Sequence, residues 1–205
     1  LQGPVPNHTG GQSAHDGLVT QGRYGGRTMR TWIHAANALT AARGLAGPLV
    51  AVLLVGLDQN RAAFWVFMYA ILTDLIDGRL VKAAGGLPNP IGVWLDPLAD
   101  KVLTDTSWVA LWIVGWAPTW LVVAMLGRDL VAGWLWMRGI RTVVPAAQVA
   151  IAFEGVALCL LLFHGPWLGV HWPSAGRVLA LISLGLFAVS LPRYWTDSLE
   201  VSRNR

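Results

Sequence analysis

Residues 146–164 read A-A-Q-V-A-I-A-F-E-G-V-A-L-C-L-L-L-F-H, an apolar run whose interior contains only two strongly polar side chains, Gln148 and Glu154. A helical run of this length covers the roughly 30 Å of hydrocarbon in a bilayer. Comparable runs lie at about 38–56, 62–78, 98–116, 118–138 and 175–192. Only helices and closed barrels satisfy their own backbone groups in lipid, and these runs are too long and too evenly apolar for barrel strands. The sequence therefore predicts an all-α polytopic membrane protein with six transmembrane helices.

The composition of the 205-residue chain agrees with a membrane location. Apolar residues make up 55% of it and charged residues 13%, against about 25% charged residues in ordinary soluble domains. A disordered chain is excluded because disorder requires low hydrophobicity and high charge. A disulfide scaffold is excluded because Cys159 is the single cysteine. The net charge is +4, but the basic residues are scattered along the chain, so we expect no nucleic-acid partner.

The segments outside the apolar runs define the expected domain organisation. Residues 1–27 are polar and rich in glycine, which predicts a flexible tail. Residues 28–36, T-M-R-T-W-I-H-A-A, suit a short amphipathic helix at the membrane surface, and the alternative is an extension of the first membrane helix. We therefore expect one six-helix domain over 28–195, followed by a short cytoplasmic tail at 196–205.

The distribution of basic residues predicts the orientation in the membrane. Six crossings place both termini on the same side. Of the 15 Lys and Arg residues, only Arg61 and Arg177 fall on the opposite side. Since Lys and Arg collect on the cytoplasmic side, we expect an integral protein of the cell's inner or plasma membrane with both termini in the cytoplasm.

An acidic cluster lies where the second and third apolar runs approach each other. Asp74 and Asp77 are three residues apart, and Asp96 and Asp100 are four apart, so each pair lies on one face of its helix. A loop rich in glycine and proline folds the chain back between the pairs, which lets the four carboxylates converge. Carboxylates near lipid are functional candidates by default, and a hard divalent cation relieves their mutual repulsion. The alternative is that these acids cap helices and pair with nearby cations, namely Arg79, Lys82 and Lys101.

The segment from Asp74 to Asp100 reads D-L-I-D-G-R-L-V-K, nine further residues, then G-V-W-L-D-P-L-A-D. It resembles the signature of the CDP-alcohol phosphatidyltransferases, D-x2-D-G-x2-A-R-x8 or 9-G-x3-D-x3-D. The aspartates, both glycines and all spacings match, whereas the family's Ala-Arg pair is Val81-Lys82 here. The segment from Asn37 to Arg43, N-A-L-T-A-A-R, is similar to the N-x-x-T-x-x-R that opens the family's first membrane helix.

This resemblance implies an enzyme that transfers a phosphatidyl group from CDP-diacylglycerol, or a similar CDP-linked lipid, to an alcohol and releases CMP. By position, Asp74, Asp77, Asp96 and Asp100 would hold two Mg²⁺ or Mn²⁺ ions, and Asp100 would also act as the general base. The residues implied for binding the CDP-lipid are Asn37, Thr40, Gly78, Val81, Lys82 and Gly92. The resemblance further implies an active site open to the cytoplasm and, as in many relatives, a homodimer.

The cations that would bind a phosphorylated acceptor lie further along the chain. Arginine binds phosphate bidentately, and Arg128 lies within the predicted fourth helix, where an unpaired charge is costly. Arg138 and Arg141 follow on the cytoplasmic side. We predict all three as ligands of the acceptor phosphate. The alternatives are a salt bridge within the bundle from Arg128 to Asp129 or Asp105, and a purely topological role for the other two arginines.

The expected acceptor is glycerol 3-phosphate, which would give phosphatidylglycerophosphate. The run L-D-P-L-A-D-K at 95–101 is similar to phosphatidylglycerophosphate synthases and to cardiolipin synthases of the family. Phosphatidylglycerol and an inositol phosphate therefore stay open as acceptors. A hypothesis of another class is a non-enzymatic cation-binding or transport protein. The crowding of the acids at the cytoplasmic ends of their helices argues against an ion path through the full membrane depth.

Overall fold

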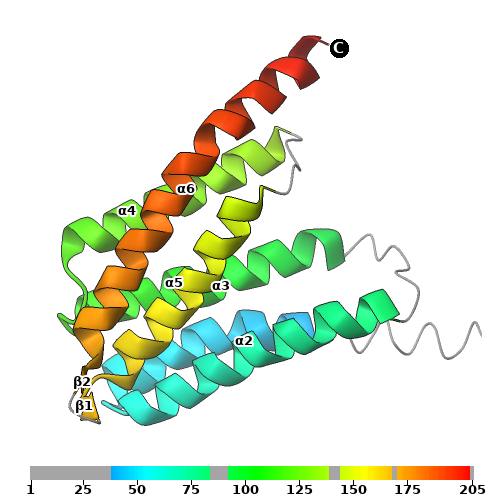
Figure 1. Cartoon of the computed structure of the whole chain (residues 1–205). Coiled ribbons are helices and arrows are strands. Elements are labelled where there is room, and N and C mark those ends of the chain that lie inside the picture. Colours follow the sequence, from blue (N-terminus) through cyan, green and yellow to red (C-terminus); the bar gives the residue numbers. More distant parts are fainter. Residues whose placement is uncertain (1–37, 84–91, 139–143, 168–169, 204–205) are drawn as a thin grey trace, which may run out of the picture.

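The computed structural model describes residues 38–83, 92–138, 144–167 and 170–203, which form a bundle of long helices (Figure 1). The elements in chain order are the first helix (Ala38–Gly56), which ends in the π-helical turn η1 (Val52–Gly56), then α2 (Asn60–Ala83), α3 (Gly92–Ile113), α4 (Thr119–Met137), α5 (Pro145–Phe163), the two-residue strands β1 (Pro166–Trp167) and β2 (Val170–His171), and α6 (Trp172–Arg203). The predicted all-α class is confirmed, and the only strands in the described part form the short antiparallel hairpin between α5 and α6. The predicted tail over 1–27 and the amphipathic helix over 28–36 lie outside the described residues.

Every predicted apolar run overlaps one helix, but two helices extend well beyond their runs. α3 begins at Gly92, so the segment around Asp96 is helical and Pro97 lies inside the helix. α6 continues through Pro192 to Arg203. Both extensions carry polar residues. Helix bounds predicted from apolar runs cannot include them, because a helix can continue beyond the hydrocarbon of the bilayer.

Four helices are long and apolar enough to cross a membrane: Ala38–Gly56, Thr119–Met137, Pro145–Phe163 and Trp172–Tyr194. α2 and α3 have 24 and 22 residues, or about 36 and 33 Å of helix, but their acidic residues lower their apolar content. That α2 and α3 also cross the membrane, which would give six crossings, therefore stays a prediction. Apolar side chains on the outside of the bundle are strongly exposed, with Leu45 at 72%, Leu130 at 74% and Val189 at 72%, which fits a lipid-facing surface.

The apolar core draws buried side chains from the first helix and from α2 to α6. Trp108, Phe67 and Leu158 are fully buried there. α5 packs along α6 and also contacts α2 and α3. A side chain at Gly176 of α6 would place its Cβ 3.0 Å from the Ala157 carbonyl oxygen, so glycine allows these two helices to pack closely.

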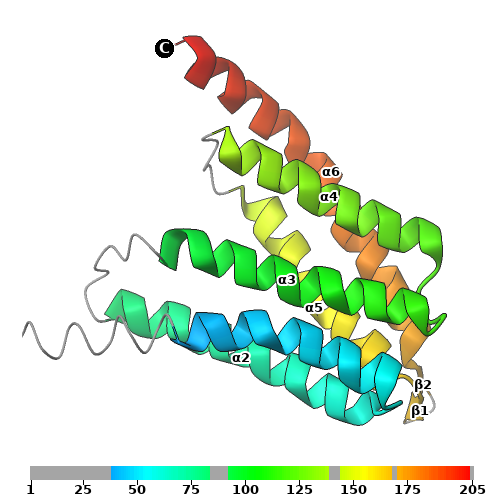
Figure 2. The same ribbon diagram turned by 180° about the vertical axis from the view of Figure 1, so that it is seen from behind.

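Gly47 determines how closely the first helix approaches α3. A Cβ at this position would lie 2.6 Å from the Val102 carbonyl oxygen and 2.9 Å from Leu103 Cα. Since those atoms are backbone, they cannot move aside easily. Figure 2 shows the first helix, in blue, alongside α2 and α3. This close contact brings the start of the first helix next to the start of α3, where the acidic residues lie.

Candidate active site

Arg43 of the first helix lies between two of the aspartates predicted as metal ligands. Its Nη1 atom is 2.7 Å from Asp74 Oδ1, on α2, and 3.0 Å from Asp100 Oδ1, on α3. The Arg43 side chain is only 3% exposed, whereas those of Asp74 and Asp100 are 52% and 50% exposed. One buried cation thus holds two carboxylates from different helices at a common point, and both carboxylates keep an open side.

Asp96 joins the same end of the bundle through Thr40. The buried Thr40 hydroxyl donates a hydrogen bond of 2.6 Å to Asp96 Oδ1. Thr40 and Arg43 are three residues apart in a helix, so they face the same direction. The two side chains together hold three aspartates at one face of the first helix. Asp74 of α2 lies 22 and 26 positions before the two aspartates of α3 in the chain.

Seven further predicted site residues are described in part or not at all. Five lie in helices, in stretches where only the backbone is described: Asp77, Gly78, Val81 and Lys82 in α2, and Gly92, the first residue of α3. Two lie outside the described residues altogether: Asn37 and Arg141. The helix bounds place Asp77 and Gly78 three and four residues after Asp74, about one turn along α2, so they belong to the same end of the bundle.

The described side chains offer oxygen ligands suited to a divalent cation. Asp74 and Asp100 both present an oxygen to the cationic nitrogen of Arg43, and carboxylates are the ligands that Mg²⁺ and Mn²⁺ prefer. Within the described residues alone, no group of three or more acidic, histidine or cysteine side chains is close enough to hold a metal ion. The donor chemistry fits a hard cation, with Asp77 needed to complete the predicted set.

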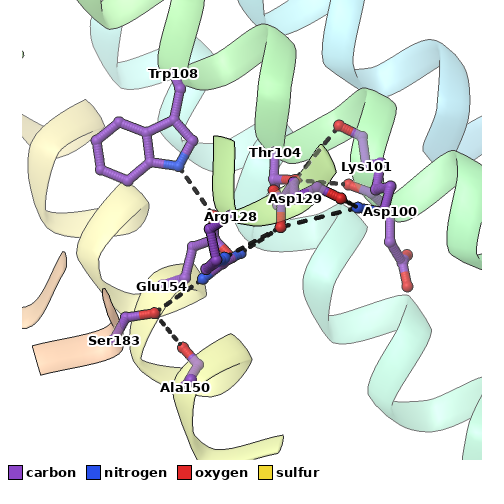
Figure 3. A network of polar contacts seen from close by, with 9 residues as sticks. All are labelled: Asp100, Lys101, Thr104, Trp108, Arg128, Asp129, Ala150, Glu154 and Ser183. Carbon is purple, nitrogen blue, oxygen red and sulfur yellow. Dashed lines mark hydrogen bonds and ion pairs between the residues drawn. The ribbon is translucent and has the colours of Figure 1, made fainter. Parts of the chain in front are cut away.

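Arg128 belongs to a second, enclosed network (Figure 3). Its Nε and Nη2 atoms donate to Asp129 Oδ1 at 3.1 and 2.7 Å, its Nη1 atom donates to Ser183 Oγ at 3.0 Å, and Nη2 also donates to Glu154 Oε2. Trp108 Nε1 donates to the other Glu154 oxygen at 3.0 Å. Arg128 is 7% exposed and Glu154 is 2% exposed. The network therefore joins α4 to α5 by an ion pair and ties α3 and α6 to that pair by hydrogen bonds.

Lys101 connects this network to the acidic end of α3. Its Nζ atom donates to the Asp129 carbonyl oxygen and lies 3.9 Å from Asp129 Oδ1. Lys101 follows Asp100 directly, so the two side chains leave α3 in different directions, one toward α4 and the other toward Arg43. Arg138, the other described candidate for the acceptor phosphate, is exposed at the end of α4, with its guanidinium 4.6 Å from the centre of the Trp134 ring.

Two participants were missing from the predicted site. Arg43 is part of the N-x-x-T-x-x-R motif but not of the predicted site, and its place three residues after Thr40 is the signal in the sequence that points to it. Glu154, one of the two strongly polar residues in the apolar run at 146–164, is the second anion paired with Arg128. The salt bridge expected as the alternative for Arg128 is present to Asp129, and the additional partner is Glu154 rather than Asp105 among the described contacts.

The comparisons with known proteins agree with the motif. The family model described as CDP-alcohol phosphatidyltransferase matches residues 33–191. A CDP-diacylglycerol–glycerol-3-phosphate 3-phosphatidyltransferase of Pseudomonas fluorescens is 31% identical over 77% of this chain and 86% of its own length. A probable phosphatidylglycerophosphate synthase of Mycobacterium tuberculosis is 34% identical over 64% of this chain and 68% of its own length.

A third relative matches a shorter part of the chain. A cardiolipin synthase (CMP-forming)/mitochondrial hydrolase fusion protein of Schizosaccharomyces pombe is 38% identical over 46% of this chain, and the match spans 16% of that much longer protein. No solved structure shows a significant match to the chain.

Proposed function

Because the chain belongs to the CDP-alcohol phosphatidyltransferase family, we propose that it transfers the phosphatidyl group of CDP-diacylglycerol to glycerol 3-phosphate and releases CMP. The observation that carries this proposal is the junction at Arg43. The signature aspartates Asp74 and Asp100 come from two helices and share one cationic partner, while each keeps an exposed side. Enclosed, fully paired carboxylates would be part of the scaffold, whereas these can bind a ligand.

Asp100 is the proposed general base. Arg43 contacts its Oδ1 atom, and we assign the other oxygen to the acceptor hydroxyl. The hydroxyl oxygen attacks the phosphorus that bears the diacylglycerol, and its proton passes to Asp100. The bond from that phosphorus to the bridging oxygen breaks, and the electron pair leaves with CMP. Arg43 keeps Asp100 in place and offsets part of its charge.

We assign Asp74, Asp77, Asp96 and Asp100 as ligands of two Mg²⁺ or Mn²⁺ ions. Ions held there would neutralise the charge of the diphosphate and of the leaving oxygen. The hydrogen bond from Thr40 holds Asp96 ready for this role. For the CDP-lipid we propose contacts from Asn37, Thr40, Gly78, Val81, Lys82 and Gly92.

For the acceptor phosphate we propose Arg128, Arg138 and Arg141. Arg138 is exposed at the end of α4. Arg128 must exchange its contact with Ser183 before its Nη1 atom can reach a phosphate. We further propose that the site and both termini face the cytoplasm and that the protein is a homodimer.

Glycerol 3-phosphate is favoured because the relatives that cover most of this chain are named for it or for its product. Phosphatidylglycerol is the second candidate acceptor, since the cardiolipin synthase fusion protein has 38% identity over its matched segment. Both acceptors attack through a hydroxyl group, so the described site would serve either reaction.

The test measures CMP release by the purified full-length chain with CDP-diacylglycerol and Mg²⁺ or Mn²⁺. Glycerol 3-phosphate, phosphatidylglycerol and an inositol phosphate are supplied in separate reactions. We expect CMP and phosphatidylglycerophosphate with glycerol 3-phosphate. CMP with phosphatidylglycerol alone would assign the cardiolipin reaction. Absence of CMP with all three, together with cation flux into liposomes lacking CDP-lipid, would support a transport protein and contradict the proposal.

A further inference from the structure

Lys101 of α3 has no assigned role in the proposed reaction. It directly follows Asp100, the proposed general base, and its Nζ atom donates a hydrogen bond to the Asp129 carbonyl oxygen of α4. Figure 3 shows this contact, with the Asp100 carboxylate on another side of α3. The Lys101 side chain is 33% exposed, against 5% for Arg128. A lysine beside the proposed base therefore stays partly open to solvent, unlike the arginine of the enclosed network.

The positive charge of Lys101 is only loosely balanced by its surroundings. Among the described side chains, the carboxylate oxygen within 4 Å of its Nζ atom is Asp129 Oδ1, at 3.9 Å, which is too far for a hydrogen bond. That oxygen already accepts two hydrogen bonds from Arg128, at 3.1 and 2.7 Å. An ammonium group has three hydrogens to donate, and the hydrogen bond to Asp129 uses one of them on a neutral carbonyl. Lys101 can therefore donate to an anion as well.

Gly133 of α4 leaves space beside this ammonium group. A Cβ at Gly133 would lie 3.8 Å from both Nζ and Cε of Lys101, in van der Waals contact with them. A longer side chain at this position would compete with a ligand for the space around Nζ. Arg138, one of the residues proposed for the acceptor phosphate, ends the same helix five residues later, or about 7.5 Å further along its axis. Lys101 thus lies between the proposed base and a second exposed cation.

We infer that Lys101 binds the phosphate of the acceptor alcohol, an assignment that rests on the proposed function. Lysine binds phosphate as a compact point charge. The hydroxyl and the phosphate of glycerol 3-phosphate are held apart by its short three-carbon chain, and consecutive residues of a helix lie about 100° apart around its axis. A molecule of this size, on the side of α3 between the two residues, can present its hydroxyl to Asp100 and its phosphate to Lys101. The alternative is that Lys101 only ties α3 to α4.

The test measures KM for glycerol 3-phosphate and for CDP-diacylglycerol in Lys101→Met, which removes the charge and keeps an unbranched side chain. We expect KM for glycerol 3-phosphate to rise about tenfold, the effect of losing one hydrogen bond between charged groups, with KM for the donor unchanged. Lys101→Arg keeps the charge and should bind the acceptor nearly as well as the wild type. The matched control is Arg177→Met, because Arg177 also donates to a backbone carbonyl, that of Trp116 at 2.9 Å; it should leave both KM values unchanged.

A lower kcat with an unchanged KM for glycerol 3-phosphate would show a structural tie and overturn the inference. Equal rises in both KM values, or a Lys101→Arg variant as impaired as Lys101→Met, would overturn it too.

A second pair of variants leaves Lys101 in place, so it does not depend on how the Lys101 variants fold. Gly133→Leu fills the space beside Nζ and should raise KM for glycerol 3-phosphate. Gly127→Leu in the same helix is the control, since a Cβ there would meet no atom within 4 Å. An unchanged KM in Gly133→Leu would contradict the inference.

CMP release by the wild-type protein with glycerol 3-phosphate is measured first and tests the proposed function. If the wild type releases CMP and Lys101→Met keeps the wild-type KM, the proposed function stands and the role of Lys101 fails. If the wild type releases none, the proposed function fails and this assignment fails with it.

Discussion

Two arginines of this protein each lie between two carboxylates, and their surroundings differ. Arg43 pairs with Asp74 and Asp100, whose side chains are about half exposed. Arg128 pairs with Asp129 and Glu154, whose side chains are 10% and 2% exposed. The same chemical pair is therefore open to a ligand in one region and enclosed by helices in the other.

The difference shows what a buried charge needs in this fold. Trp108 supplies a further hydrogen bond to Glu154, and Ser183 accepts one from Arg128, so the enclosed pair is supported on several sides. Enclosed charges lose the stabilisation of water and depend on such partners. At Arg43 the exposed carboxylates keep solvent as a partner, which a metal ion or substrate can replace. Exposure therefore separates the carboxylates that can exchange water for a ligand from the carboxylates that are paired inside the bundle.

The largest expected effect is on turnover in the open region. Asp100→Asn removes the proposed base while keeping its size, and we expect kcat to fall about 10²–10⁴-fold. CMP release is the measurement. Asp58→Asn at the opposite end of the bundle is the matched control, because asparagine also tolerates the positive φ of 52° found there. Wild-type turnover in a folded Asp100→Asn variant would remove Asp100 from the mechanism.

Removing its arginine should cost the enclosed region more stability than the open region. Arg128→Met leaves Glu154 without the cation that it pairs with and leaves Asp129 with Lys101, 3.9 Å away, and we expect the free energy of unfolding to fall by about 3–5 kcal/mol. Arg43→Met should cost less, because water can solvate Asp74 and Asp100. Unfolding in detergent with increasing denaturant measures both changes. Equal losses of stability in the two variants would contradict the distinction between the regions.

A change that separates the first helix from α3 should disturb the open region around Arg43 more than the enclosed region around Arg128. Gly47→Ala forces apart the backbones that bring Arg43 to Asp100, at an expected cost of about 1–3 kcal/mol, with a fall in CMP release. Gly185→Ala serves as control, since a Cβ there would meet no atom within 4 Å. If Gly47→Ala retains wild-type stability and activity, the contact does not determine the placement of the site.

The smallest expected effect concerns Asp96. Thr40→Val keeps the shape of the side chain but removes its hydrogen bond to the carboxylate. We expect kcat/KM to fall about tenfold. A loss of this size is at the low end of the free energies typical of hydrogen bonds to charged groups, which we expect here because Asp96 is exposed. Thr40→Ser should retain most of the activity. A Thr40→Ser variant as impaired as Thr40→Val would indicate that the methyl group matters rather than the hydroxyl.

Much of the fold could be predicted because apolar runs set the number and order of the helices. The convergence of Asp74, Asp96 and Asp100 also followed from their spacing and from the fold-back between α2 and α3. The role of Arg43 could not be predicted from periodicity, since its partners lie more than 30 residues away in the chain and depend on the contact at Gly47. The role of Glu154 could not be predicted either, because it depends on which side chain of another helix it contacts.

The most direct test of the central claim is Mn²⁺ binding by the purified protein, followed by electron paramagnetic resonance of the free ion. The wild-type protein should bind Mn²⁺, and the double variant Asp74→Asn/Asp100→Asn should lose that binding. Asp58→Asn, with the same chemical change at the opposite end, should bind as the wild type does. Unchanged Mn²⁺ binding by the double variant would show that the open carboxylates beside Arg43 are not the metal site.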